Sequence, residues 1–268
     1  MCRSDKEGGH RCADHLRHRE ASIDDIRPDP APGRPDIDWA TDTASTPEQL
    51  YRDYPDHVAA LVVDTMTAAK QQEAAMTSDV LAALPSGARM HGLVFRMKSP
   101  DSLARKLDQR CKKAPFTPPE QHAADITDVV RYTAISRPDQ VVATARSMAD
   151  GLAACGWTVV EAEQSYLEGN QYKGLHMLAR HSSGHIAEFQ FHTDASQQLK
   201  DETHVDYEKA RDTRVPAAER AALTEKMTAR WAKLSTPAGL AALAELGGCA
   251  VTPKRYAQRT MNRGRDAQ

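Results

Sequence analysis

Aromatic residues and long apolar runs are scarce in this chain. Phe, Trp and Tyr make up 5% of its 268 residues, so the core must come mainly from Ala, Leu and Val, which favours helices packed around a modest sheet. No apolar run approaches the ~20 residues that a membrane-spanning helix needs. The polar N-terminus lacks the apolar segment of a secretory signal. We therefore expect a cytoplasmic protein without a membrane partner.

The chain also lacks a strong net charge and a disulfide framework. Its formal charge of −2 at pH 7 excludes a general basic field that would hold nucleic acid without sequence preference. Any phosphate-binding surface must therefore be local. The five cysteines are scattered and odd in number, which favours reduced thiols in a reducing compartment over paired disulfides.

Residues 1–45 are rich in Asp, Arg, Pro and Gly and show almost no apolar periodicity. Such a segment buries too little apolar area to offset the entropy lost on ordering, which predicts a disordered N-terminal tail. Cys2, His10, Cys12 and His15 are metal-capable, but their spacing matches no standard zinc pattern. A tail is therefore favoured over a small zinc site.

A helix start is well signalled at residues 46–49, where Thr-Pro-Glu-Gln supplies an N-cap hydroxyl, proline at the first helical position and Gln three residues after the cap. Apolar residues at helical spacing then continue to residue 84. A second capping signal at Thr77 and Ser78 predicts a break there. We therefore expect N-terminal helices over residues 46–84.

Between residues 85 and 212, strand patterns alternate with helix patterns. Strands are expected at residues 93–98, 126–135, 158–163, 175–180 and 186–192, helices at 102–112 and 138–155, and a proline-containing loop at 114–120. This alternation predicts an α/β (α+β) fold in which a mixed central sheet is flanked by helices. Residues 213–268 are expected to form a C-terminal helical extension.

The first group of candidate functional residues is Arg96, Lys98, Ser102 and Lys106. On a strand, Arg96 and Lys98 point to the same face, and Ser102 and Lys106 lie one turn apart on one side of the following helix. Together they would place three cations and a hydroxyl around a helix N-terminus, which favours anions such as a polyphosphate. Solvated basic residues on an edge strand are an equally good interpretation of this group alone.

Two carboxylates on expected strands are candidate metal ligands. Asp128 lies in an apolar strand, where a carboxylate is costly unless it is paired or metal-bound, and Arg131 three residues later is a candidate phosphate ligand. Glu188, Gln190 and His192 alternate with two phenylalanines, which is typical of a strand with one face on the core and the other towards a cleft. Asp128 and Glu188 are placed to share Mg²⁺. A strand-end ion pair and a polar outer strand face are the plainer alternatives.

A glycine-flanked loop between these strands carries Asn170, Tyr172 and His176. A loop tyrosine is a reasonable stacking platform for a nucleobase, and His176 is placed to contact phosphate or sugar. Packed residues with satisfied polar tips are the alternative.

Each group is weak alone, but the order and spacing of all of them are specific. Arg-x-Lys-Ser-x-x-Ser-x-x-x-Lys, Asp…Arg, Asn-x-Tyr-x-x-x-His, Glu-x-Gln-x-x-Thr and His-x-x-Tyr follow one another over about half the chain. In this order, residues 85–212 resemble the synthetase domain of the RelA/SpoT family. The resemblance implies a nucleotidyltransferase-like fold and a Mg²⁺-dependent enzyme of the alarmone-synthesising type. Such an enzyme transfers the β,γ-pyrophosphate of ATP to the ribose 3′-hydroxyl of an acceptor nucleotide and releases AMP.

The resemblance also implies roles for the residues. The implied ATP-binding residues are Arg96, Lys98, Ser102, Lys106 and Arg131. The implied metal ligands are Asp128 and Glu188, with Glu188 also the base for the acceptor hydroxyl. The implied acceptor-binding residues are Asn170, Tyr172, His176 and Gln190, with Tyr172 stacked on the base.

Three features depart from the family pattern around the acceptor side. The central strand has the short spacing Asp-x-x-Arg, Glu168 stands where many guanine-nucleotide synthetases have a cation, and Gly174 stands where a small polar residue is common. The acceptor is therefore left open between GDP or GTP, an adenine nucleotide and the 3′ end of tRNA. The last two are typical of toxin-like relatives, which would add an antitoxin partner.

No segment resembling the family's His-Asp hydrolase is found upstream, which predicts a synthetase-only protein. Its flanking helices are candidates for self-association into a homo-oligomer. A catalytically inactive nucleotide-sensing or protein-binding module is the alternative from another class. The presence of both carboxylates argues against it, because a dead site has no need of two costly charges.

Overall fold

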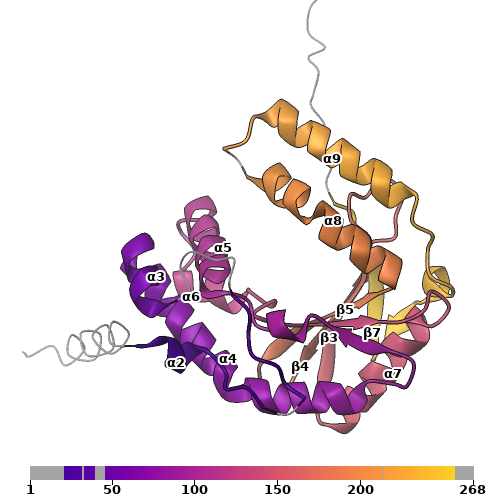
Figure 1. The fold of residues 1–268 in the computed structure, drawn as a ribbon, viewed down its shortest axis with the longest axis horizontal. Helices are drawn as coiled ribbons and strands as arrows, with labels where there is room; N and C mark the ends of the chain where they lie inside the picture. Colours follow the sequence, from indigo (N-terminus) through magenta and orange to yellow (C-terminus); the bar gives the residue numbers. More distant parts are fainter. Residues whose placement is uncertain (1–20, 32, 40–45, 213, 257–268) are drawn as a thin grey trace, which may run out of the picture.

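The structure is a computed structural model that describes residues 21–31, 33–39, 46–212 and 214–256 (Figure 1). The helices are α2 (Ile23–Ile26), α3 (Pro47–Asp53), α4 (Asp56–Ala83), α5 (Pro100–Lys113), α6 (Pro119–Ala124), α7 (Val141–Ala154), α8 (Asp194–Arg211) and α9 (Ala217–Ala232). The strands are β1 (Arg89–His91), β2 (Val130–Ile135), β3 (Thr158–Gln164), β4 (Leu175–Arg180), β5 (Ile186–His192), β6 (Glu245–Leu246) and β7 (Cys249–Pro253). Two 3-10 turns are η1 (Leu93–Phe95) and η2 (Leu240–Ala242).

The described strands form one mixed sheet in the order β1-β2-β5-β4-β3-β7-β6. The pairs β2–β5 and β3–β7 are parallel, and the other neighbours are antiparallel. The predicted α/β (α+β) fold with a mixed sheet flanked by helices is therefore confirmed. The strands expected at 158–163, 175–180 and 186–192 are found within one residue of their predicted ends.

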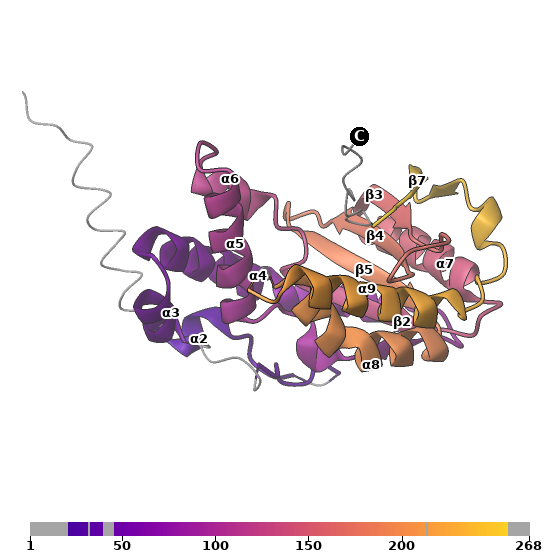
Figure 2. The same cartoon turned by 90° about the horizontal axis from the view of Figure 1, so that it is seen from above.

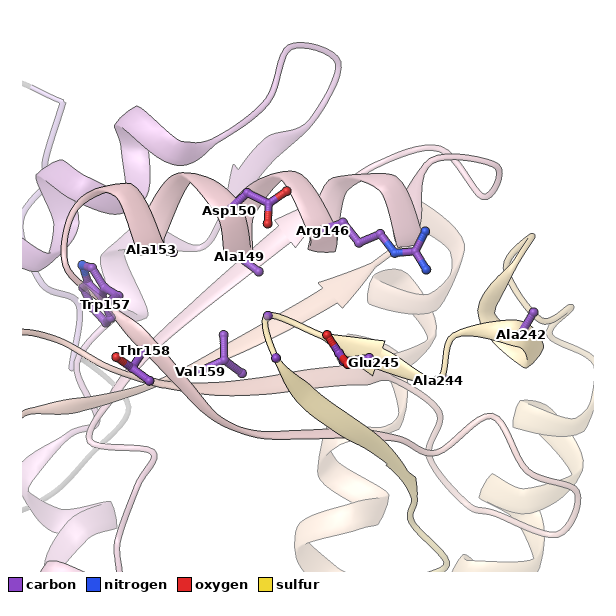
Figure 3. A pocket seen from close by; sticks show the side chains of 12 residues that line it. Arg146, Ala149, Asp150, Ala153, Trp157, Thr158, Val159, Ala242, Ala244 and Glu245 are labelled. Atoms are coloured by element: carbon purple, nitrogen blue, oxygen red, sulfur yellow. The ribbon is translucent and has the colours of Figure 1, made fainter.

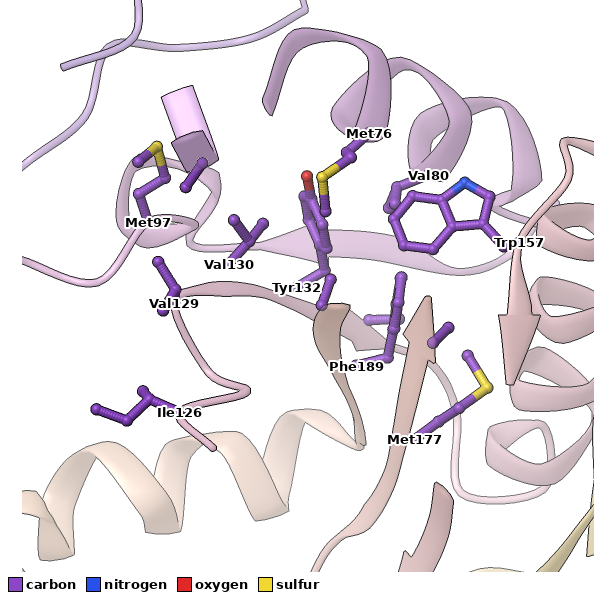
Figure 4. Packing of buried hydrophobic residues seen from close by; sticks show 14 of the residues in the cluster. Met76, Val80, Met97, Ile126, Val129, Val130, Tyr132, Trp157, Met177 and Phe189 are labelled. Atoms are coloured by element: carbon purple, nitrogen blue, oxygen red, sulfur yellow. The ribbon is translucent and has the colours of Figure 1, made fainter. Parts of the chain in front are cut away.

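One face of the sheet forms the core together with α4 and α7. Figure 4 shows Tyr132 of β2 and Phe189 of β5 beside Met76 and Val80 of α4. The rings of Tyr132 and Phe189 stack at a centroid distance of 5.5 Å, and both side chains are buried. Burial of a side chain of this size stabilises by roughly 1.5–3 kcal/mol. A one-residue slip of β5 would exchange Phe189 for a polar neighbour, so this packing determines the register.

The opposite face of the sheet carries polar residues. The strand registers place Arg131 opposite Glu188 and His176 opposite Gln190. Figures 1 and 2 both show α8 and α9 side by side on this side of the sheet, away from α4. The predicted alternation of β5 is therefore confirmed, and it separates the core from a polar layer.

The predicted helix start at Thr46 is confirmed, because its hydroxyl accepts a hydrogen bond from the Gln49 N–H at 3.3 Å. The predicted break is in the wrong place. The helix ends before Pro55, and α4 then runs without interruption through Thr77. Thr77 is buried, and its hydroxyl donates to Glu73 at 2.6 Å, so this side chain makes a core contact and caps no helix.

The expected strand at residues 93–98 is wrong. Gly92 adopts a left-handed conformation (φ 62°), which turns the chain into η1. The extended segment comes earlier, as β1 at the edge of the sheet. Two neighbouring boundaries also differ. The loop expected at 114–120 ends where α6 begins, and the strand expected from residue 126 begins at Val130, so Asp128 precedes it.

The disordered tail predicted for residues 1–45 is corrected where the structure describes it. Ile26, Ile37 and Trp39 are buried in the core, and Trp39 Nε1 donates to the Met97 carbonyl oxygen at 3.2 Å. Three apolar anchors separated by proline-rich chain produce no periodicity, so the sequence pattern conceals them. The metal-capable residues of this segment, Cys2, His10, Cys12 and His15, lie outside the described residues.

The expected C-terminal helical extension is corrected beyond α9. The chain there forms a β6–β7 hairpin, and β7 joins the sheet parallel to β3. Gly247 and Gly248, with φ of 56° and 84°, make its turn, and such a glycine pair is a hairpin signal.

The residues that the structure describes include no helix with the length and apolar content to cross a membrane. Cys111, Cys155 and Cys249 carry free thiols.

Candidate active site

The polar face of the sheet contains a cavity of about 190 Å³. Its lining includes Lys106 of α5, Asp128 before β2, Glu163 of β3, His176 of β4, Glu188 of β5 and Lys254 after β7. Four of the residues that the sequence singles out, Lys106, Asp128, His176 and Glu188, are thus brought together from different elements.

Asp128 lies between two lysines. Lys106 Nζ donates to Asp128 Oδ1 at 2.8 Å, and Lys98 Nζ donates to Oδ2 at 3.2 Å. Burial opposes ionisation of Asp128, but the attraction of Lys98 and Lys106 outweighs it and holds the pKa of this carboxyl well below its usual range. Burial in turn lowers the pKa of Lys98, against the attraction of Asp128. Asp128 at the cavity is therefore a carboxylate that is ionised at neutral pH and held between two amines.

Local capping positions these lysines. Ser99 Oγ accepts from the Ser102 N–H at 3.3 Å and Pro100 occupies the first turn, so α5 begins two residues before the predicted residue 102. Lys98 stands just before this cap, and Lys106 lies further along the helix. Ser102 is in the first turn, where its hydroxyl accepts from Arg105 Nη2 at 3.3 Å.

Arg96 does not join this cavity. Its side chain is 1% exposed, and Nε donates to Glu73 of α4 at 2.5 Å. Its Nη1 donates to the carbonyl oxygens of Pro35 and Leu93 at 2.6 and 2.8 Å. Because η1 replaces the expected strand, Arg96 and Lys98 do not share a face. The expectation that they stand together around a phosphate is therefore not met, and Arg96 is a buried counter-ion of Glu73.

Glu188 and Gln190 project from β5 on the polar face, as predicted. Gln190 Nε2 donates to Glu188 Oε1 at 3.1 Å, and Gln190 Oε1 accepts from Lys200 Nζ at 2.6 Å. A protonated lysine only donates, so this contact sets which end of the amide faces Glu188. Arg131, on β2, stands opposite Glu188.

His176 connects the carboxylates to the loop residues. Its Nδ1 lies 3.5 Å from Glu188 Oε1 and 3.6 Å from Glu163 Oε1. Its Nε2 lies 2.8 Å from Tyr172 Oη. Glu163 also forms an ion pair with Lys254. Burial opposes ionisation of Glu163, but hydrogen bonds from His176 and Lys254 outweigh it and lower its pKa.

Tyr172 is enclosed by other side chains. Its Oη also lies 2.9 Å from His192 Nε2, and its ring makes edge contacts with Trp231 at 5.1 Å and Tyr256 at 6.0 Å between centroids. Burial raises the pKa of Tyr172 and lowers the pKa of His192, each far from its usual value, so both are neutral at pH 7. The expectation of an open stacking platform is not met, because Trp231 and Tyr256 cover the ring.

Asn170 makes structural hydrogen bonds. It is 3% exposed, and its Nδ2 donates to the carbonyl oxygens of Ser165 and Lys254, both at 2.9 Å. Its Oδ1 accepts from the Tyr256 N–H at 3.1 Å. These contacts tie the segment after β7 to the loop, and they leave the amide little capacity for an acceptor.

Sequence reasoning missed four charged residues of the polar face, Glu161, Glu163, Lys200 and Lys254. The two glutamates alternate along β3, and this spacing is a usable signal of one polar strand face. Lys254 follows a strand in a segment expected to be helical. Lys200 lies on a helix of mostly polar residues, where nothing in the pattern distinguishes it from a solvated lysine.

Asp128 and Glu188 are the predicted ligands for a divalent cation. Mg²⁺ takes few protein carboxylates and keeps water or phosphate oxygens in its shell, so two carboxylates at one cavity fit this ion. No group of three or more His, Cys, Asp or Glu side chains suited to a metal occurs among the described residues. The residues therefore fit Mg²⁺ only where ligand phosphates complete its coordination.

A larger hollow of about 720 Å³ lies along α7 and β3. Figure 3 shows Arg146 and Asp150 of α7 on one side of it and Val159 and Glu245 on the other. None of the residues predicted to carry chemistry lines this hollow. The smaller cavity is therefore the candidate active site.

No protein-family model and no curated protein sequence matches the chain. Among solved structures, it is similar to the small alarmone synthetase 1 from Bacillus subtilis, with a TM-score of 0.41 and 13% identity over 66% of this chain and 92% of that one. That synthetase bound to its product pppGpp gives a TM-score of 0.34 and 14% identity over 55% and 71%. The Type VI effector Tas1, in complex with its immunity protein, gives 0.37 and 18% over 67% and 97%.

Proposed function

We propose that the chain is a cytoplasmic, Mg²⁺-dependent pyrophosphokinase that transfers the β,γ-pyrophosphate of ATP to the 3′-hydroxyl of an acceptor nucleotide. The observation that carries the proposal is the convergence of Lys106, Asp128, His176 and Glu188 on one cavity, although they come from a helix, a loop and two strands. Amines, an ionised carboxylate and a general base are what such a transfer requires.

Lys98, Lys106 and the start of α5 at Ser102 are the proposed ATP-phosphate ligands. Two amines and the first turn of a helix neutralise a polyphosphate without any covalent step. Both amines now contact Asp128, so substrate binding would exchange these ion pairs for contacts with phosphate. Arg96 is left out of this set because it is paired with Glu73 in the core.

In the proposed reaction, the acceptor 3′-oxygen attacks the β-phosphorus of ATP. The bond between that phosphorus and the α,β-bridging oxygen breaks, and AMP leaves. Glu188 is the proposed base that takes the proton of the 3′-hydroxyl. Its carboxylate is oriented by the Gln190 amide and lies close to His176.

Asp128 and Glu188 are the proposed Mg²⁺ ligands. When bound, Mg²⁺ neutralises charge on the oxygens of the transferred group. The low pKa of Asp128 keeps this carboxylate ionised and able to bind a cation at neutral pH.

The proposed acceptor side consists of His176 and Gln190, with Glu163 and Lys254 beside them. Tyr172, whose ring is covered, contributes through the contact of its hydroxyl with His176. GDP or GTP, an adenine nucleotide and the 3′ end of tRNA are the acceptors to compare. Transfer to either of the last two would indicate a toxin that needs an antitoxin partner.

The test is a transfer assay with ATP labelled in its terminal phosphate, Mg²⁺ and separate acceptors: GDP, GTP, AMP, ADP, ATP and bulk tRNA. Glu188→Gln keeps the shape of the side chain and removes the base. Glu219→Gln, which changes an exposed residue of α9, is the matched control. We expect label to move to one acceptor class and Glu188→Gln to lose about 10²- to 10⁴-fold in rate.

Full activity of Glu188→Gln would remove the base from the proposal. Folded wild-type protein that binds ATP but labels none of the six acceptors would contradict the proposed activity.

A further inference from the structure

α8 brings to the polar face a lysine that the proposed reaction leaves without a role. Lys200 is half-buried, and its Nζ donates to Gln190 Oε1 at 2.6 Å. That oxygen belongs to a neutral amide. No carboxylate within the described ranges forms an ion pair with Lys200, so this cation has no counter-ion in contact.

Arg131 is a second cation close enough to Lys200 to interact with its charge. It is half-buried on β2, opposite Glu188 of β5. Its guanidinium makes no hydrogen bond or ion pair with any residue that the structure describes. The two cations interact: burial, followed by the charge of Arg131, lowers the pKa of Lys200 to about 8, and the opposing attraction of Glu188 and Asp201 does not compensate.

The two nearby carboxylates are engaged with other partners. Glu188 accepts from the Gln190 amide and lies 3.5 Å from His176. Asp201 accepts from Gln197 Nε2 at 2.8 Å. Two cations taken partly out of water cost free energy that an anion in contact would offset. The charge balance of this region therefore favours a bound anion.

We propose that Lys200 joins Arg131, which the sequence resemblance assigns to ATP, in a phosphate-binding subsite beside Glu188. The proposal rests on the proposed function, because a nucleotide substrate supplies the anion. A guanidinium fork binds two phosphate oxygens at once, and an ammonium adds a compact charge with three donors. The phosphate belongs either to ATP or to the 5′ end of the acceptor, and one experiment separates these sources.

The experiment is titration calorimetry on the full chain without turnover. The first two ligands are inorganic pyrophosphate and α,β-methylene ATP, an analogue that cannot release AMP. GDP and ADP are each compared with their nucleoside, guanosine or adenosine, which lacks the phosphates. The variants are Lys200→Met and Arg131→Met, with Lys200→Arg as the conservative substitution. Lys209→Met, which removes an exposed cation from the same helix, is the matched control.

We expect Lys200→Met and Arg131→Met each to weaken binding of the relevant phosphate ligand by about 10-fold or more, as for one charge-assisted hydrogen bond. Guanosine and adenosine should bind the variants as they bind the wild type, and Lys200→Arg should retain most of the affinity. A loss confined to α,β-methylene ATP assigns the subsite to ATP, and a loss confined to the diphosphates assigns it to the acceptor.

Unchanged affinity for every phosphate ligand in folded Lys200→Met and Arg131→Met overturns the proposal, as does a wild type that binds none of them. A purely positioning role gives a different result. If Lys200 acts only by orienting Gln190, the effect of Lys200→Met disappears in a Gln190→Ala background. Because binding needs no transfer, this outcome is independent of whether the Glu188 assay shows activity.

Discussion

Gly174→Ala tests whether the contact between Tyr172 and His176 shapes the acceptor side. Gly174 precedes β4 and is not among the glycines with positive φ, so its backbone conformation accepts alanine. A Cβ built on it would lie 2.7 Å from His176 Nε2 and 2.8 Å from Tyr172 Oη. Side-chain carbons do not approach so closely, so the two polar tips must separate.

The magnitude follows from two opposing effects. Breaking this hydrogen bond and leaving its partners buried costs about 1–3 kcal/mol. Restricting the unfolded chain by Gly→Ala stabilises by about 0.4–1 kcal/mol. We therefore expect the free energy of unfolding to fall by roughly 0.5–2 kcal/mol in urea denaturation. In the transfer assay, we expect KM for the acceptor to rise by about 3- to 10-fold and KM for ATP to stay constant.

The control is the same substitution in a Tyr172→Phe background. Without the hydroxyl, the new methyl group meets one polar tip fewer, so Gly174→Ala should cost less there than in the wild type. An equal cost in both backgrounds, or a variant more stable than the wild type with unchanged acceptor KM, would refute this reasoning.

Three further predictions concern the surroundings of the site. Glu73→Gln leaves Arg96 without a charged partner in the core and should lower the free energy of unfolding by about 3–5 kcal/mol in urea; a small change would contradict a buried ion pair. The pKa of Asp128 is depressed below its ordinary value of 3.8, so ionised Asp128 stabilises the folded protein above that pH, and this contribution is lost as the pH falls towards the folded pKa. The urea midpoints of the wild type and Asp128→Asn should therefore converge on acidification. A constant difference between them would count against the two lysine pairs. Asn170→Ala should cost about 1–3 kcal/mol by freeing the segment around Lys254, whereas a selective rise in acceptor KM at unchanged stability would restore Asn170 as a ligand.

The parts of the site that follow a strand period were predictable from the sequence. The alternation of Glu188 and Gln190 with Phe189 and Phe191 is a local signal, because one face of β5 must join the core. The helix α5 was predictable as well, although it begins at Pro100, two residues before the predicted start. These local rules place Glu188 on the polar face of β5 and Lys106 on α5, but Asp128 precedes β2 and is held by its contacts with Lys98 and Lys106.

The remainder depends on contacts between residues far apart in the chain. Arg96 is drawn into the core by Glu73, and the left-handed turn at Gly92 removes the strand on which its predicted orientation depended. Trp231 and Tyr256, which cover Tyr172, come from the C-terminal part of the sequence. No spacing rule connects such residues, so a search for periodicity does not find them.

In the proposed reaction, ATP gives up an intact pyrophosphate. The most direct measurement uses ATP labelled in both the β- and γ-phosphates with the acceptor that proves active, and quantifies AMP, ADP and labelled product in a single turnover. We predict AMP and product in a one-to-one ratio, with both labelled phosphates on the 3′-oxygen of the acceptor. Glu188→Gln should form both about 10²- to 10⁴-fold more slowly. Release of ADP with only the γ-phosphate transferred, or hydrolysis without a labelled acceptor, would contradict the account.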